Sequence, residues 1–166
     1  MERTAQKHPF PSIYTPDSRV LILGSFPSPR SRNEAFFYAH PQNRFWRVLA
    51  AVFNENVPRD IEEKKALLLR NRVALWDTIE SCEVAGASDA SIINVVANDL
   101  RPILREADIR AIFCNGAASY QWFNRLLRDT LEREAVLLPS TSPANAAWTL
   151  DKLIEAWGAQ IRPCLE

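Results

Sequence analysis

The stretch Arg19–Gly24, with the sequence RVLILG, decides the class of fold that this chain can adopt. It is a short apolar run with β-branched residues that ends at a glycine, which is typical of a strand buried on both faces. Strands of this kind occur in parallel sheets that carry helices on both sides. We therefore expect Arg19–Gly24 to lie at the centre of such a sheet.

Outward from this strand, the sequence alternates between segments with helical periodicity and short apolar runs. The predicted helices are Asn43–Phe53, Arg59–Asn71, Asn98–Ala107, Ala117–Leu131 and Asn145–Ile161, and the other predicted strands are Arg72–Trp76, Ile109–Cys114 and Ala135–Leu138. This alternation predicts an α/β fold, a three-layer α/β/α sandwich with a central, mostly parallel four-stranded sheet. Within it we expect Pro102 in the first turn of its helix and Ala147 on the inward face of the last one.

Size and composition favour a single domain. The chain has 166 residues, of which 47% are hydrophobic and 24% charged, as in one soluble globular domain. We interpret residues 19–166 as that domain and residues 1–18, which are polar and contain three prolines, as a loosely ordered lead-in. The N-terminus has no signal-peptide core, and no stretch approaches the ~20 apolar residues that cross a bilayer, so a cytoplasmic protein is expected.

Charge and cysteine content limit the possible partners. The 20 basic residues balance the 20 acidic ones, so the chain lacks the overall basic character of many nucleic-acid-binding proteins. The segment Arg19–Arg47 nevertheless contains five arginines and one acid, Glu34, and these arginines either face phosphates or are ordinary surface residues. Cys82, Cys114 and Cys164 form no CxxC pair, which argues against a disulfide framework, a zinc site and an iron–sulfur site.

Ligands of parallel sheets bind at the carboxyl ends of the strands. That rule selects four candidate loops, Gly24–Asn43, Asp77–Ser91, Asn115–Ser119 and Pro139–Asn145. The first begins with GSFPS, where glycine permits a tight exit from the strand and proline stiffens the loop. Because GxSxG, GxGxxG and GxxxxGK[ST] are all missing, and neither His8 nor His40 has an evident aspartate partner, serine hydrolase and nucleotide-binding functions are disfavoured.

The same loop continues as FFYAHPQNRFW over residues 36–46. Aromatic rings next to amide, imidazole and guanidinium groups are what a pocket for a flat heterocycle requires, because stacking holds the ring and amides read its edge. We expect Phe45 and Trp46 to be core residues of the following helix, and Tyr38 and Asn43 to face a ligand. Asn43 is also a candidate N-cap of that helix.

The last candidate loop carries the sequence LPSTSPAN over residues 138–145. Small hydroxyl residues and prolines before a helix are suited to binding an anion, such as a phosphate of the DNA backbone. The alternative is an ordinary turn rich in serine and threonine that caps the helix.

The motifs GSFPS, FYAHPQNRFW and PSTSPAN, in this order before a terminal helix, resemble the uracil-DNA glycosylase superfamily over nearly the whole chain. The form FYAHPxNRFW is similar to that of the mismatch-specific members. Those members carry an asparagine two residues after the first glycine, whereas this chain has Phe26 there. The hypoxanthine-DNA glycosylase branch also lacks that asparagine. The segments Trp76–Cys82 and Gly86–Ile92 resemble the same branch, and Ser140–Ser142 stands where true uracil glycosylases have a histidine.

The resemblance implies a monofunctional DNA-deoxyinosine glycosylase of base excision repair that releases hypoxanthine, leaves an abasic site, and needs neither metal nor cofactor. It implies Asn43 as the catalytic residue that orients the attacking water, and a monomer that binds DNA. The implied base-binding residues are Ser25, Phe26, Tyr38, His40 and Asn115, and the implied DNA-binding residues are Arg44, Ser140, Thr141, Ser142 and Asn145. Thr141 or Ser142 is expected to enter the minor groove.

Two alternatives stay open at this point. A uracil- or mismatch-specific glycosylase of the same superfamily differs only in the shape of its base pocket. A non-catalytic domain that binds nucleic acid or a small ligand is compatible with the same fold, because fold alone does not determine function.

Overall fold

The computed structural model describes residues 4–84 and 92–166, and a four-stranded parallel sheet forms its centre. The strand order is β3-β2-β6-β7, and each neighbouring pair is parallel. The strands are β2 (Val20–Gly24), β3 (Val73–Asp77), β6 (Ala111–Asn115) and β7 (Ala135–Leu138). All four predicted strands are therefore confirmed.

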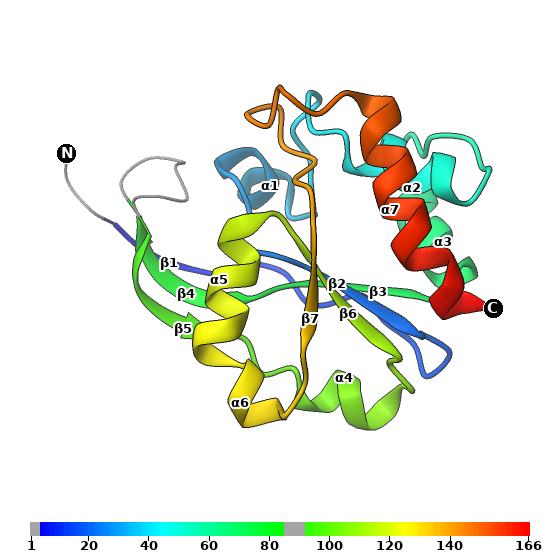
Figure 1. Cartoon of the computed structure of the whole chain (residues 1–166). Helices are drawn as coiled ribbons and strands as arrows, with labels where there is room; N and C mark the ends of the chain where they lie inside the picture. The colour runs from blue at the N-terminus through cyan, green and yellow to red at the C-terminus, as the bar shows by residue number, and fades with distance from the viewer. Residues whose placement is uncertain (1–3, 85–91) are drawn as a thin grey trace.

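Helices cover both faces of this sheet (Figure 1). On one side lie α2 (Phe45–Val52), α3 (Ile61–Arg70) and α7 (Leu150–Leu165), and on the other α4 (Arg101–Glu106), α5 (Ala117–Leu126) and α6 (Arg128–Leu131). Alternate residues of β2 serve the two faces, because Val20 and Ile22 pack toward α2 and α7, whereas Leu21 and Leu23 pack toward α4 and α5. The predicted α/β/α sandwich is confirmed. In the part of the chain that is described, every helix is too short or too polar to cross a membrane.

The terminal helix begins later than predicted. Its first residue is Leu150, and the side chain of Thr149 caps it by accepting a hydrogen bond from the backbone N–H of Lys152. The segment that precedes the helix is therefore a longer loop, residues 139–149, and Ala147 is exposed in it rather than turned inward. Pro102 lies in the first turn of α4, as expected.

A second, antiparallel sheet was not predicted. It has the order β1-β4-β5 and consists of β1 (Thr4–Lys7), β4 (Ile79–Val84) and β5 (Ile93–Ala97). β4 continues the chain directly from β3, where the backbone N–H of Thr78 donates to the carbonyl of Gly24. The predicted loop over residues 77–91 is thus a strand as far as residue 84, and its remainder, residues 85–91, lies outside the described residues.

The expectation of a loosely ordered lead-in is wrong for residues 4–18. β1 pairs with β4, Ile13 forms a bridge with Leu75 of β3, and Phe10 is buried with 7% of its surface exposed. The hydrophobic periodicity of the sequence did not predict these contacts, because each is made by a single side chain or a short strand. Likewise, the Gly24–Asn43 segment is not continuous loop, since it contains the short helix α1 (Pro29–Glu34), which Ser28 caps.

Phe10→Ala should show that this N-terminal segment belongs to the folded domain. Removing a buried phenylalanine ring is expected to lower the free energy of unfolding by about 3–5 kcal/mol. The loss has two sources, the hydrophobic free energy of burying the ring and the cavity that the ring leaves behind. Urea denaturation followed by circular dichroism measures the change, with the exposed Lys7→Ala as control. A change within about 0.5 kcal/mol, as for ordinary surface substitutions, would contradict the assignment.

Candidate active site

A cavity of about 270 Å³ opens at the carboxyl edge of the parallel sheet. This is the edge at which ligands of parallel sheets are expected to bind. This volume lies just below the usual range for small-molecule sites. The lining residues are Gly24–Ser28, Ser31, Arg32, Phe37, Tyr38, His40, Asn43, Asp77, Ile92, Asn115 and Ser140–Pro143. Segments that follow β2, β3, β6 and β7 thus contribute to one hollow.

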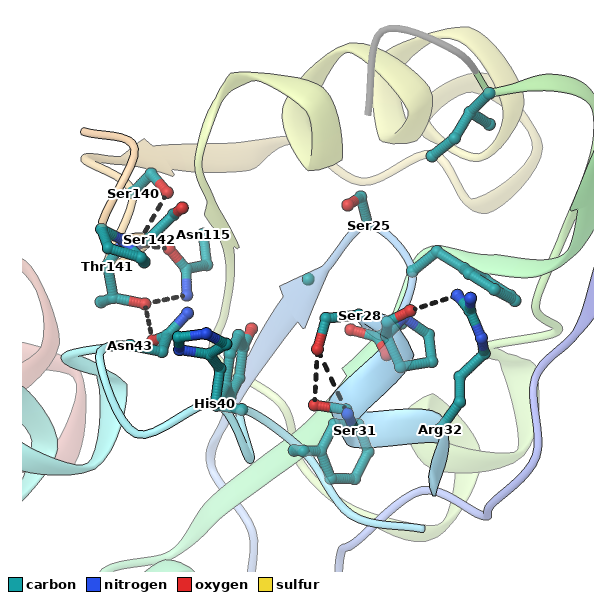
Figure 2. A pocket seen from close by; sticks show the side chains of 18 residues that line it. Ser25, Ser28, Ser31, Arg32, His40, Asn43, Asn115, Ser140, Thr141 and Ser142 are labelled. Carbon is teal, nitrogen blue, oxygen red and sulfur yellow. Dashed lines mark hydrogen bonds between the residues drawn. The ribbon is translucent and has the colours of Figure 1, made fainter. Parts of the chain in front are cut away.

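Thr141 joins three of these segments on one wall of the cavity (Figure 2). Its hydroxyl donates to Oδ1 of Asn43 at 2.8 Å and accepts from Nδ2 of Asn115 at 3.0 Å. Its backbone N–H donates to Oδ1 of Asn115, also at 3.0 Å. Thr141 is fully buried, so these hydrogen bonds are protected from water and hold the three side chains in one arrangement.

These contacts determine which end of the Asn43 amide faces the cavity. Oδ1 of Asn43 accepts from both the Thr141 hydroxyl and the backbone N–H of Phe45, at 2.8 Å and 2.9 Å. The N-cap position of α2 is occupied by Arg44, so the expectation that Asn43 is the N-cap is wrong, although its Oδ1 still accepts from the first backbone N–H of the helix. With the carbonyl oxygen engaged twice, the amide NH₂ group is the part of Asn43 left for a ligand in the cavity.

Asn115 and Arg44 have most of their polar atoms engaged inside the protein. Both amide ends of Asn115 bind Thr141, which leaves one of its N–H donors for a ligand. The guanidinium of Arg44 donates to the backbone carbonyls of Ser142 at 2.9 Å and Asn145 at 3.1 Å. It also donates to the carbonyls of residues 141 and 148, so Arg44 holds the whole loop before α7 in shape.

The remaining predicted residues, apart from Asn145, also line the cavity. Ser140 and Ser142 line the same wall as Thr141, and Ser25 lies at the end of β2 (Figure 2). His40 is exposed, and its Nδ1 accepts from the backbone N–H of Gln42. With the exception of Arg44 and Asn145, all the predicted site residues therefore line one cavity. Arg44 does not line it but supports the loop that does. Asn145 stabilises the loop by donating to the carbonyl of residue 140 at 3.0 Å.

Two aromatic side chains in the cavity can contact a flat ligand. The ring of Tyr38 stacks on Phe45 with centroids 4.1 Å apart, which covers one face of Tyr38. Phe26 also lines the cavity, and the guanidinium of Arg32 lies 5.6 Å from the centre of its ring. Both rings are partly exposed, so each retains surface for stacking.

The lining of the cavity includes a carboxylate, that of Asp77, which no sequence motif indicated. Asp77 ends β3, and its Oδ2 lies 2.8 Å from Nε2 of His8, with the two side chains only 5% and 2% exposed. The expectation that neither histidine has an aspartate partner is therefore wrong for His8. Asp77 could have been selected, because it lies at the carboxyl end of a predicted strand. His8 could not, because it is 69 positions away from Asp77 and no pattern in residues 1–18 indicated it.

Gly24 is required by the same carboxylate. A Cβ atom at this position would lie 2.3 Å from Oδ1 of Asp77 and 2.8 Å from the hydroxyl oxygen of Tyr38. Contacts this short do not occur, so any side chain here would displace groups that line the cavity. The absence of a side chain at Gly24 thus leaves space for the side chains of Asp77 and Tyr38 in the cavity lining.

The cysteines and acidic residues offer little for metal or thiol chemistry in residues 4–84 and 92–166. No group of three or more histidine, cysteine, aspartate or glutamate residues in these ranges is placed to hold a metal ion. Cys82, Cys114 and Cys164 form no disulfide there. Burial raises the pKa of the Cys114 thiol to about 11, so it is protonated and unreactive at neutral pH.

Thr141→Val tests whether this residue holds the wall together. The change keeps the shape of the side chain but removes one of the two donors to Oδ1 of Asn43 and leaves an N–H of Asn115 without its acceptor, so the free energy of unfolding should fall by about 1–3 kcal/mol. Thermal or urea denaturation gives the value, and the exposed Thr130→Val on α6 is the matched control. Equal stability of the two variants would show that the hydroxyl contributes nothing.

Comparison with known proteins gives a consistent result. The family model described as the uracil DNA glycosylase superfamily matches residues 11–159. A protein named hypoxanthine DNA glycosylase from Methanosarcina acetivorans is 31% identical over 94% of this chain and 98% of its own length. A protein of the same name from Methanosarcina barkeri is 29% identical over 84% of this chain and 89% of its own length.

The fold comparison agrees with these matches. The solution NMR structure of a Methanosarcina acetivorans protein, assigned as a candidate uracil DNA glycosylase, superposes with a TM-score of 0.80. That comparison covers 98% of this chain and 100% of the other one, at 29% identity.

Proposed function

The chain belongs to the uracil DNA glycosylase superfamily, and we propose that it hydrolyses the N-glycosidic bond of deoxyinosine in DNA, releasing hypoxanthine and leaving an abasic site. The observation that carries the proposal is the cavity at the carboxyl edge of the sheet, into which Asn43 presents an amide fixed by two hydrogen bonds. The two Methanosarcina relatives named hypoxanthine DNA glycosylase support the choice of base.

The cavity can receive the base only after the base leaves the DNA stack. Unstacking and unpairing a nucleotide cost a few kcal/mol, and the cost is smallest for a poorly paired base such as hypoxanthine. Once extruded, the flat ring would stack on Phe26 or Tyr38, both of which line the cavity. Selection for damaged nucleotides thus begins with the ease of extrusion.

Asn43 would act on the attacking water through its amide NH₂ group. This group can donate a hydrogen bond to the water oxygen and hold it beneath the sugar, but an amide is too weak a base to remove its proton. The glycosidic bond must therefore break to a large extent first, so that the sugar carries positive charge when water adds. The protein contributes fixed dipoles around the cavity, which need no reorganisation as this charge develops.

The loop 139–149 would grip the DNA backbone. Thr141 is buried and bound to its neighbours, so contacts with DNA fall to Ser142 and the exposed residues that follow it, such as Pro143 and Ala144. Arg30 and Arg47 are exposed and could contact phosphates, unlike Arg44, whose donors serve the loop itself. The enzyme would act on DNA as a monomer inside the cell.

Asn43→Ala in an excision assay tests the proposed function. Duplexes that carry a single inosine, uracil or xanthine are incubated with the purified protein, and abasic sites are cleaved with alkali and counted. Inosine should be excised fastest, and Asn43→Ala should lower that rate by about 10²–10³-fold, the usual effect of removing one preorganised donor. The exposed Asn56→Ala, far from the cavity, should keep the full rate.

The other outcomes lead to different conclusions. Faster excision of uracil would support the uracil-specific alternative, which agrees with the name given to the related NMR structure. If no duplex is cut while the folded protein still binds DNA, the proposal of an enzyme is overturned in favour of a binding domain.

A further inference from the structure

The carboxylate of Asp77 has one oxygen engaged and one available in the cavity. Oδ2 is bound by His8 at 2.8 Å, whereas Oδ1 lies against Gly24 and makes no hydrogen bond within residues 4–84 and 92–166. The side chain is 5% exposed and still lines the cavity. A charged oxygen in such a place is stabilised by a hydrogen-bond donor, which a ligand can supply.

The contacts of His8 indicate which of its ring nitrogens donates to Asp77. The backbone N–H of Phe10 donates to Nδ1 of His8 at 3.5 Å, so the proton of the neutral ring lies on Nε2 and is donated to Asp77. The rings of Phe10 and Trp76 enclose the imidazole, each with its centroid 4.6 Å away. His8 is thus a fixed donor to Oδ2, and Asp77 can offer its other oxygen only as an acceptor.

Resting on the function proposed above, we propose that Asp77 reads the base by accepting a hydrogen bond from a ring N–H that adjoins a carbonyl, and that His8 is its positioning residue. Hypoxanthine and uracil both carry such an N–H, which deamination creates. Their parents, adenine and cytosine, instead present a ring nitrogen lone pair at the corresponding place. The carboxylate would therefore distinguish these two deaminated bases from the normal bases they arise from.

The discrimination follows from the charge of Asp77. A base with the N–H satisfies the buried carboxylate, whereas a base with a lone pair faces it with like polarity and leaves it without a donor. Sites that hydrogen-bond a substrate group reject analogues that lack it far more strongly than apolar pockets reject a change in size. An asparagine at this position would lose the preference, because His8 would hold its oxygen and its NH₂ would face the base.

Asp77→Asn is tested on two duplexes, one with deoxyinosine and one with deoxynebularine, whose unsubstituted purine lacks both the N–H and the carbonyl. The ratio of single-turnover excision rates, inosine over nebularine, should fall at least about tenfold in the variant, the effect of one hydrogen bond in discrimination. Glu106→Gln removes a carboxylate that accepts from Tyr14 outside the cavity, and it should leave the ratio unchanged. An unchanged ratio in Asp77→Asn would overturn the proposal.

Variants of His8 separate positioning from mere support of the fold. His8→Leu removes the donor and should lower the same ratio, whereas His8→Gln keeps an N–H within reach of Asp77 and should restore much of it. If His8→Leu lowers both rates equally and leaves the ratio intact, His8 is only structural. Thermal unfolding of each variant establishes that the folded state is compared.

Failure of the proposed function can be told apart from failure of this inference. If the wild type cuts neither duplex, excision is ruled out, and calorimetric binding of free hypoxanthine and free purine to the intact protein decides the role of Asp77. Preference for hypoxanthine in the wild type but not in Asp77→Asn would support the reading role. Equal binding of the two bases by the wild type, or none, would overturn it.

Discussion

The hydroxyl of Thr141 is the contact on which the site depends most. It connects Asn43 at the start of α2, Asn115 at the end of β6 and the loop after β7, which are far apart in the sequence. Because the hydroxyl is buried, each connected amide has a fixed orientation rather than a choice of partners. Asn43, which we propose as the catalytic residue, lies outside regular structure, and this contact fixes its side chain.

A second set of contacts supports another part of the cavity lining. Gly24 ends the central strand without a side chain, Asp77 fills the space beside it, and His8 comes from a segment that precedes the parallel sheet. The antiparallel sheet has a role here, because pairing of β1 with β4 brings the N-terminal segment to the end of β3. The additional sheet is therefore part of the site as well as of the scaffold.

The sequence was sufficient to predict the strands and helices whose hydrophobic residues follow a regular period. Buried strands and amphipathic helices have periods, so the central sheet, its two covering layers and the loops at its carboxyl edge were predictable, including Asn43 in the cavity. Contacts made by single residues have no period. The pairing of His8 with Asp77, the burial of Phe10 and the use of Arg44 inside the loop depend on tertiary geometry, and only the structure reveals them.

A crystal structure of the Asn43→Ala variant with a duplex that contains deoxyinosine would show whether the cavity at the carboxyl edge receives a base extruded from DNA, because slow chemistry would preserve the intact nucleotide. We expect the hypoxanthine ring inside the cavity, next to Phe26 or Tyr38, with its N–H toward Asp77. A duplex bound elsewhere, or bound here with the inosine still stacked between its neighbours, would show that the cavity does not receive the base.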